Sequence, residues 1–489
     1  MARTISHTLL LTGVLVADAP LHVGSADTGH ESDLPLAVDG KNRFYLPGSS
    51  LAGAIRAWER AAADDAVWGF AHGDQGQASQ VLVDDAPVRD APLAELWHGI
   101  GIDRHDGGAA RRVKFDRQVL PRGSRFDFRL LREVAVGDDL ATARLQMGRI
   151  ARALEAGEIP FGGGSTRGYG RVLLRDARAR ETQWNTRDGV LAWLQGKQTD
   201  ALAQWRTAAG AAAADSCLRI SIEWQPRGPL MSKAARDGLA VDSLPFVSQD
   251  GNGLALTLPG SSIKGALRSH AERIVRTVPG DDLPLAATQH IDQLAVDLVR
   301  ELFGSARPAD AAIAAGALPG ARALLSVDTC YAAAALADAE LALFDAARED
   351  WHDSVHLARA DHVAIDRWTG GAADSLLYSA IEPRRCTWQP IRLRFRAGGG
   401  NAPEDTAALA LLWLTLRDFC AGRIALGYGA NRGYGDLRVS RLTIDWPATG
   451  EQQILPVTDG AIDESGMTGR LARMKQAWQE WQATKEGTP

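Results

Sequence analysis

The chain contains one unusual segment twice. "LPLAVDGKNRFYLPGSSLAGAIR" spans 34–56 and "LPFVSQDGNGLALTLPGSSIKGALR" spans 244–268, with Asp33 and Asp242 just ahead of them. Further matches follow in the same order. Their offset rises steadily from 209 at the aspartates (242 − 33) to 265 at "STRGYGRV" and "ANRGYGDL", aligned on their last glycine (435 − 170). Chance matches would scatter, so the rise predicts two homologous copies, the second enlarged by loops.

Each copy has the same order of patterns. An apolar strand is followed by a helix after the Ser-Ser pair, two strands, a long apolar helix, a glycine-rich loop and a short strand. The order βαββαβ is that of the ferredoxin-like split βαβ sandwich, which is also the layout of RRM-like RNA-binding modules. We therefore expect an α+β chain of two tandem ferredoxin-like domains with inserted hairpins.

The repeat also predicts the domain limits. We expect a first domain over 1–176, a helical connector or linker over 177–216, a second domain with insertions over 217–463 and a C-terminal helix over 464–489. The last helix should be amphipathic and docked on its own domain, because four large apolar residues share one helical face. These are Leu471, Met474, Trp478 and Trp481.

Composition limits the functional classes. A net charge of −6 and a pI near 6.0 argue against a protein that coats nucleic acid with its whole surface, but leave room for a local basic groove. Four widely spaced cysteines favour neither a zinc site nor a disulfide framework and fit a reducing cytoplasm. No apolar stretch approaches the ~18 residues of a membrane span. We expect a cytoplasmic protein with no membrane partner.

The repeated Pro-Gly-Ser-Ser segment predicts a helix start that a serine caps. Such a small, bare helix start is also an anion site, and nearby basic side chains would add to it. An ordinary capped helix is the alternative. The candidates for binding an RNA backbone are Ser49, Ser50 and Arg56 in the first copy and Ser261, Ser262, Lys264 and Arg268 in the second.

The glycine-rich loops "FGGGSTRGYGRV" and "LGYGANRGYGDL" each follow a helix and precede a strand. Neither fits a Walker loop or a dinucleotide fingerprint. Glycine lets a ligand backbone approach closely, so these loops predict contact with an extended phosphate backbone; a tight helix-to-strand turn is the alternative. The candidate residues are Gly163, Gly164 and Arg167, then Gly429 and Arg432.

Asp33 and Asp242 are the candidate catalytic and metal-binding residues. A carboxylate beside a held RNA strand can position a divalent metal, Mg²⁺ or Mn²⁺, or help to move the proton of a 2′-hydroxyl. Glu31 and Asp237 lie close enough in sequence to share the metal. The alternative is that both aspartates are merely solvated.

A turn-rich hairpin interrupts each copy. The match of "VKFDR" with "VAIDR" gives Arg117 and Arg367 equivalent places, and we expect Trp368 to stack on a base. A hairpin that only covers a sheet edge is the alternative.

Taken together, "PLHVGS", "LPGSSLAGAIR" and "GGGSTRGYGRV" resemble the RAMP superfamily, and most closely the backbone subunits of type III CRISPR effector complexes. Two fused copies resemble the double backbone subunit of type III-D-like systems. The resemblance implies that each half is a RAMP domain that binds guide CRISPR RNA, with its hairpin as a thumb that displaces nucleotides. It also implies that Asp33 and Asp242 cut complementary single-stranded target RNA with a divalent metal, among other type III subunits. The second copy has "LMSKAARDG" in place of the His-x-Gly-Ser element.

Three alternatives stay open. The chain could be a non-catalytic scaffold of the same complex, or a RAMP endoribonuclease that processes precursor CRISPR RNA. Two full copies without a shared histidine count against the processing enzyme. The third is a duplicated ferredoxin-like interaction module that binds no RNA.

Overall fold

The computed structural model describes residues 3–25, 32–210, 217–235, 238, 241–251, 253–278, 290–306, 320–344, 356–397, 402–447 and 449–486. The chain divides into two compact units. Unit 1 comprises Met1–Trp97, Asp116–Ser165 and Tyr169–Ala213, and unit 2 comprises His98–Phe115, Thr166–Gly168 and Ala214–Pro489. Each unit has its own apolar core.

Unit 1 contains a four-stranded antiparallel sheet with the strand order β10-β1-β9-β5. The long strand β1 (Ile5–Ala17) is central and pairs with β9 (Arg125–Ala135) on one side and β10 (Val172–Gln183) on the other. The short strand β5 (Val81–Val83) lies outside β9. β10 continues beyond residue 176, so the last strand extends into the segment predicted as a connector.

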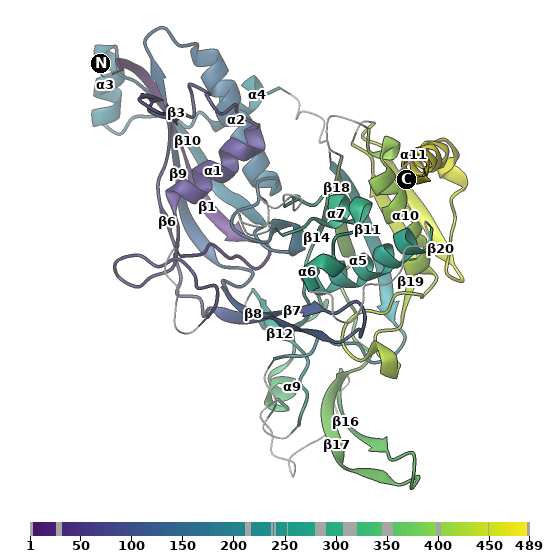
Figure 1. Ribbon diagram of the computed structural model, residues 1–489. Coiled ribbons are helices and arrows are strands. Elements are labelled where there is room, and N and C mark those ends of the chain that lie inside the picture. The colour runs from purple at the N-terminus through teal and green to yellow at the C-terminus, as the bar shows by residue number, and fades with distance from the viewer. Residues whose placement is uncertain are drawn as a thin grey trace. The chain divides into compact units, whose positions relative to one another are not determined.

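Two helices pack their apolar faces on this sheet (Figure 1). They are α1 (Gly48–Glu59), which follows β1, and α2 (Leu140–Ala156), which follows β9. The sequence order is therefore β1-α1-β5-β9-α2-β10 along this sheet. The other elements before residue 211 are β2 (Tyr45–Leu46), β3 (Phe70–His72), β4 (Gln75–Gln77), β6 (Ala86–Pro87), β7 (Glu95–Ile102), β8 (Ala109–Val119), the 3₁₀ turn η1 (Ser165–Arg167), α3 (Arg187–Leu194) and α4 (Leu202–Ala208).

Unit 2 repeats this arrangement with additions. Its antiparallel sheet has the order β14-β18-β11-β19-β20-β21. The strands are β11 (Cys217–Pro226), β14 (Leu325–Val327), β18 (Ile391–Arg396), β19 (Leu437–Asp445), β20 (Gln452–Thr458) and β21 (Ala461–Ile462). The helices α5 (Gly260–Thr277) and α10 (Ala407–Cys420) occupy the places of α1 and α2 in the sequence order.

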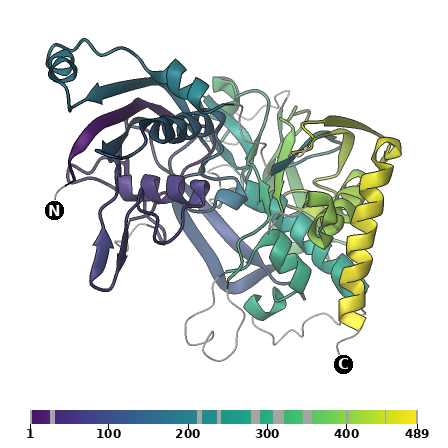
Figure 2. The same ribbon diagram turned by 90° about the horizontal axis from the view of Figure 1, so that it is seen from above.

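A hairpin of β16 (Leu357–Ile365) and β17 (Ala372–Pro383) projects away from the six-stranded sheet of unit 2 (Figure 1). The C-terminal helix α11 (Thr468–Glu486) lies along α10, in yellow in Figure 2. The other elements of this half are β12 (Val247–Asp250), β13 (Gly253–Leu258), α6 (His290–Gln293), α7 (Asp297–Phe303), β15 (Cys330–Tyr331), α9 (Asp338–Ala342) and the 3₁₀ turns η3 (Pro403–Asp405), η4 (Ala430–Arg432) and η5 (Ser465–Met467).

The predicted apolar face of α11 packs on the core of unit 2. Met474 is buried there, while Leu471, Trp478 and Trp481 pack against the cluster from its edge. The C-terminal helix is therefore docked on unit 2. The mixed α+β class with antiparallel sheets is confirmed.

Strand register supports the duplication independently of the motifs. In unit 1, Ala17 lies opposite Val172, and in unit 2 Pro226 lies opposite Leu437. The offsets are 209 (226 − 17) and 265 (437 − 172), the values predicted for the aspartates and the glycine loops. Both central strands also have a register shift in the same region: it directly precedes Val14 in β1 and directly follows Glu223, the residue at the offset of 209, in β11.

The two hairpins share a turn that the sequence alignment missed. "IDRHDGG" (102–108) links β7 to β8, and "IDRWTGG" (365–371) links β16 to β17, at an offset of 263. Asp103 and Asp366 each donate their backbone N–H to a glycine carbonyl across the turn, over 2.9 Å in both hairpins. Their carboxylates accept from the backbone N–H groups of the next residues but one, His105 and Trp368.

The predicted match of Arg117 with Arg367 is therefore wrong. Arg117 lies within β8, the second strand of its hairpin, whereas Arg367 lies in the turn that follows the first strand of the other. The counterpart of Arg367 is Arg104. The two-residue Asp-Arg match was too short to distinguish a strand from a turn.

No helix among the described residues is long and apolar enough to cross a membrane.

Two glycines of α1 predict opposite stability effects. A Cβ at Gly48 would collide with the carbonyl oxygen of Val83, whereas a Cβ at Gly53 would have no atom within 4 Å. We expect Gly48→Ala to lower the free energy of unfolding by roughly 1–3 kcal/mol, and Gly53→Ala to raise it by up to about 1 kcal/mol because alanine favours a helix interior. Urea denaturation of both variants measures this; equal effects would contradict it. Gly260 and Gly265 are the matched pair in α5.

Candidate functional site

The two glycine-rich loops have the same backbone. Four glycines in each have positive φ: +76, +79, +88 and +81° in the first loop and +83, +77, +84 and +76° in the second. They are Gly162, Gly164, Gly168 and Gly170, then Gly427, Gly429, Gly433 and Gly435. L-residues avoid this region, so the conformation itself requires glycine at these positions.

Each loop is bound to the segment that follows the first strand of its sheet. Gly170 donates its N–H to the carbonyl of Pro20 over 2.8 Å, and Gly435 donates to Pro229 over 3.0 Å. A Cβ at Gly162 would collide with the carbonyl oxygen of His22, and one at Gly427 with that of Met231. Gly163 has no such constraint: its φ is ordinary, and it is exposed. Backbone conformation therefore explains four glycines of the first loop, whereas the ordinary φ of Gly163 does not require glycine.

The repeated helices are not capped by their serines, which corrects our prediction. Both begin after a proline that makes no side-chain cap bond. The cap comes from the residue that follows the neighbouring strand: Asp85 Oδ1 accepts from Gly48 N–H over 2.7 Å, and Thr329 Oγ1 accepts from Gly260 N–H over 3.2 Å. The helix start of the first copy therefore already has a carboxylate, whose negative charge disfavours binding of a second anion. The second copy has a neutral hydroxyl at this place, which disfavours an anion less.

The serines instead line exposed helix surface. Ser49 and Ser50 are exposed on α1, and Ser261 and Ser262 are half-exposed on α5. Gly53 and Gly265 follow one turn later in open space. Each helix thus presents a strip without bulky side chains, which allows another backbone to approach closely.

Three basic side chains predicted to contact RNA have partners inside the protein. Arg56 Nη1 donates to the carbonyl of Gly69 over 3.1 Å, and Arg268 Nη1 donates to that of Gly304 over 2.9 Å, an equivalent bond in each copy. Lys264 is buried, and its Nζ donates to the carbonyls of Leu325 and Thr166 over 2.8 and 3.2 Å. These bonds give all three side chains a structural role.

Asp33 and Asp242 are exposed and held in the same way. Asp33 Oδ2 accepts from the backbone N–H of Asp116 over 2.9 Å, and Asp242 Oδ2 accepts from that of Ser379 over 2.7 Å. Asp116 and Ser379 lie at equivalent positions in the second strands of the hairpins, at the hairpin offset of 263. The structure thus gives each predicted acid the same anchor.

The two acids have different neighbours. Asp33 and Asp116 exchange bonds, because Asp116 Oδ1 also accepts from the N–H of Asp33 over 2.7 Å, so the anchor of the first copy includes two carboxylates. In the second copy the Ser379 hydroxyl donates to Asp242 Oδ2 over 3.1 Å. The sequence analysis missed Asp116 and Ser379, since only the correct hairpin alignment on "IDRxxGG" would have placed them at one position.

Each site offers only one or two carboxylates, so a Mg²⁺ or Mn²⁺ ion bound there would retain several water ligands and would not be enclosed by protein. The described part of the chain contains no cluster of three or more His, Cys, Asp or Glu side chains arranged for a metal. Glu31 and Asp237, the predicted co-ligands, lie outside the described residues.

In unit 1 the strand that anchors the acid also contacts the glycine loop. The buried Arg117 lies on β8 with its Cζ 5.2 Å from the ring centroid of Tyr169 in the loop. His22 Nδ1 lies 2.8 Å from the carbonyl oxygen of Gln118, and burial lowers the pKa of this histidine. Acid, hairpin strand and loop therefore form one connected site.

In unit 2 the corresponding contacts use other side chains. Arg432 donates to the hydroxyl of Tyr378 on β17, next to Ser379. Tyr434 of the loop donates to Glu382, and its hydroxyl lies 2.9 Å from His362 Nε2. The second copy reaches the same connection with a different set of side chains.

Of the remaining predicted RNA contacts, three are exposed and two are half-buried. Arg167 is exposed in η1, Arg367 is exposed in the β16–β17 turn, and Trp368 beside it is 96% exposed. Gly164 and Gly429 are half-buried at loop positions that require positive φ. An almost fully exposed tryptophan on a projecting turn has no packing role within the described structure.

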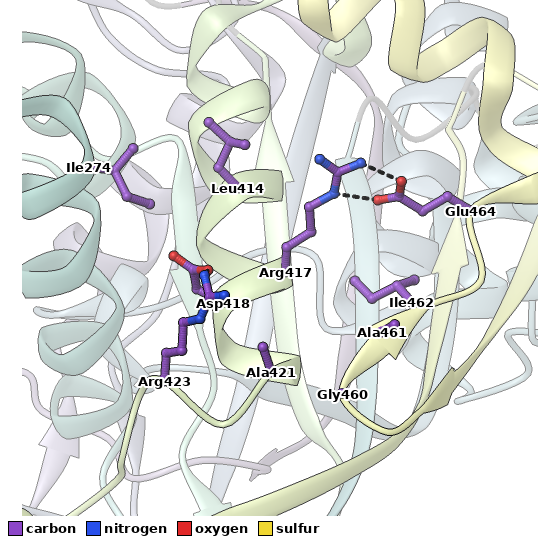
Figure 3. Close-up of a pocket in the computed structure, with 10 residues that line it drawn as sticks. All are labelled: Ile274, Leu414, Arg417, Asp418, Ala421, Arg423, Gly460, Ala461, Ile462 and Glu464. Carbon is purple, nitrogen blue, oxygen red and sulfur yellow. Dashed lines mark hydrogen bonds and ion pairs between the residues drawn. The ribbon is translucent and has the colours of Figure 1, made fainter. Parts of the chain in front are cut away.

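A cavity of about 530 Å³ lies elsewhere in unit 2, between α5, α10 and the β20–β21 turn (Figure 3). Its arginines are paired: Arg417 with Glu464 over 2.6 Å and Arg423 with Asp418 over 2.5 Å. Because these charges are balanced within the lining, the cavity does not suit a phosphate and is not part of the candidate site.

The buried Lys264 predicts a pH effect. Burial, followed by repulsion from Arg167 and Arg268, lowers the pKa of its amine from 10.5 to about 7. Between those values the unfolded chain binds a proton that the folded chain does not, so the free energy of unfolding should rise with pH, by up to about 1.4 kcal/mol per unit. In Lys264→Met this contribution should vanish. Urea denaturation of the wild type and of Lys264→Met at pH 7, 8 and 9 gives the slope of the free energy of unfolding against pH. Equal slopes for the two proteins would contradict the lowered pKa of Lys264.

The family model described as "RAMPs: RAMP superfamily" matches the chain over residues 14–173 and 249–438. The two matched regions contain both repeated helices, both hairpins and both glycine loops. No curated protein matches the chain.

Proposed function

The chain belongs to the RAMP superfamily, as a protein with two RAMP copies, and from this we propose that it is a guide-binding backbone subunit of a type III CRISPR effector complex that cuts target RNA. RAMP proteins are in general CRISPR-associated and bind RNA. The order β1-α1-β5-β9-α2-β10 and the sheet order β10-β1-β9-β5 support our further proposal that each copy is a ferredoxin-like domain.

We assign guide binding to the bare helix strips and the glycine loops. Ser49, Ser50 and Gly53 with their counterparts leave space for an RNA backbone, and the exposed Gly163 and Arg167 lie in the loop of the first copy. Arginine pairs bidentately with phosphate, which suits Arg167 and Arg432. The exposed hairpin tip with Trp368 would act as the thumb between nucleotides.

The observation that carries the cleavage proposal is the common anchor of Asp33 and Asp242. Each carboxylate is exposed yet held by a backbone N–H from the same position of its hairpin, so the two acids have equivalent fixed positions. A merely solvated loop acid needs no such anchor. In our proposal each carboxylate orients the reacting target strand and accepts the proton of a 2′-hydroxyl as that oxygen attacks the adjacent phosphate.

Attack breaks the bond from phosphorus to the 5′-oxygen. One fragment retains a cyclic 2′,3′-phosphate, and the departing 5′-oxygen takes a proton from water and becomes a 5′-hydroxyl. Asp33, with Asp116 beside it, would hold a divalent ion in the first copy, and Asp242 alone in the second. When bound, the ion would stabilise the charge that develops on the phosphate. We therefore expect the second site to need a higher metal concentration.

Separate asparagine substitutions test catalysis. Asn can still accept from the N–H of Asp116 or Ser379 but has no charge, so Asp33→Asn and Asp242→Asn should each abolish one cleavage position. We expect a fall of at least about 100-fold in rate at that position, with target binding unchanged. The assay uses the assembled complex and a labelled complementary RNA. Asp90→Asn, an exposed acid with no assigned role, is the control.

If both variants cut as the wild type does, the chain is a scaffold and the catalytic assignment fails. Cutting of precursor guide RNA by the isolated chain in EDTA would instead favour a processing enzyme.

Salt dependence tests the RNA contact of Arg167. Removing one phosphate contact should reduce the slope of log affinity against log salt by about 0.7 for single-stranded RNA. We expect this for Arg167→Gln and no change for Arg187→Gln, an exposed arginine of α3. Fluorescence anisotropy with a labelled RNA between 50 and 200 mM salt measures the slopes. Identical slopes for both variants would contradict the contact.

A further inference from the structure

Two tyrosine rings of unit 2 hold an arginine between them. The Cζ atom of Arg432 lies 4.9 Å from the ring centroid of Tyr428 and 5.4 Å from that of Tyr378. Its Nη1 also donates to the Tyr378 hydroxyl. The arginine is exposed and both tyrosines are half-buried, so this group, here called the tyrosine slot, is open to a ligand.

Planar and cationic groups continue on both sides of the slot. The Nζ of Lys233 lies 5.8 Å from the centroid of Tyr428. On the other side, His362 stacks on Tyr378 with centroids 5.0 Å apart and planes 18° apart. Flat aromatic faces between cations form a surface that binds a planar heterocycle by stacking and cation–π attraction.

The shared backbone does not require this slot. At the matching positions the first copy has Gly163 for Tyr428 and Phe115 for Tyr378, while Arg167 corresponds to Arg432. The first loop has the same glycine conformation without the tyrosine, so Tyr428 is not needed to build the loop. A half-buried tyrosine that the fold does not need calls for another explanation.

The slot also adjoins the candidate acid. Tyr378 directly precedes Ser379 in β17, and Ser379 N–H binds the carboxylate of Asp242 over 2.7 Å. Successive side chains of a strand point to opposite faces, so the ring of Tyr378 is connected to the anchor of Asp242 through the backbone of β17.

We propose that the tyrosine slot binds one unpaired nucleobase of an RNA strand. The base enters between Tyr428 and Tyr378, and Arg432 leaves the slot to pair with the phosphate of the same nucleotide. The inference rests on the proposed function of RNA binding. The slot makes the second copy selective for the type of base, whereas the first copy, which has no such slot, is not selective. Purines, with the larger stacking area, are the preferred class.

Full-length protein freed of nucleic acid, with fluorescent 12-nucleotide oligo(A) and oligo(U), tests this. The wild type should bind oligo(A) more tightly. Tyr428→Leu should lose about tenfold in affinity for oligo(A), within the range of one base stack, with an unchanged salt slope. Tyr428→Phe retains the ring and should lose less than twofold. Tyr378→Phe frees Arg432 from its hydroxyl partner and should tighten oligo(A) binding, which a purely structural role would not do.

Cross-linking needs no variant and covers the case in which Tyr428→Leu does not fold. RNA that contains 8-azidoadenosine should label the wild-type peptide with Tyr428 or Tyr378. Labelling only of other peptides, or equal affinities for Tyr428→Leu and the wild type, would overturn the slot and leave the proposed function standing. Failure of the wild type to bind either RNA would overturn the proposed function itself.

Discussion

The bond from the glycine loop back to the segment after the first strand supports the whole candidate site. In each copy the last loop glycine donates to a proline carbonyl, Pro20 or Pro229, and a second loop glycine packs on the carbonyl two residues further on. In each copy the candidate acid follows that second carbonyl by 11 positions in the sequence (33 − 22 and 242 − 231). The hairpin strand that holds the acid is in turn in contact with the loop through side chains, Arg117 with Tyr169 in the first copy and Tyr378 with Arg432 in the second. Backbone and side-chain contacts together thus connect three distant segments of the chain.

On this common frame the copies have different chemistry. Asp85 caps the helix of the first copy and Thr329 that of the second, and the acids are anchored by Asp116 and Ser379. The first copy thus concentrates negative charge around its helix start and its acid. The second copy replaces those carboxylates with hydroxyls and adds aromatic rings at its loop. A duplicated backbone has retained its hydrogen bonds while the side chains around the acids have diverged.

The sequence predicted the duplication, the helices, the glycine loops and the equivalence of Asp33 and Asp242, because each of these depends on local patterns that occur twice. It failed where a partner comes from a distant segment. The helix caps are residues after a neighbouring strand, so the adjacent serines were a reasonable but wrong choice. The sequence also did not reveal the burial of Lys264, because the two carbonyls that its amine binds belong to distant segments of the chain.

The hairpin error shows how misleading a short match is when a longer one exists. Asp-Arg alone aligned a strand with a turn, whereas Ile-Asp-Arg-x-x-Gly-Gly aligns both turns with matching backbone bonds.

The two hairpin tips share one turn conformation that accepts different residues at its exposed positions. Aspartate and the closing glycines make the same bonds in both bends, although the two residues between Arg104 or Arg367 and those glycines differ. Thr369 adds a bond of its own, since its Oγ1 accepts from Gly371 N–H over 3.3 Å. The first copy has His-Asp there and the second Trp-Thr. A substitution at such a tip can change the charge or aromatic character of the exposed surface without disturbing the strands of the hairpin. These four positions can therefore change most easily when a binding partner changes.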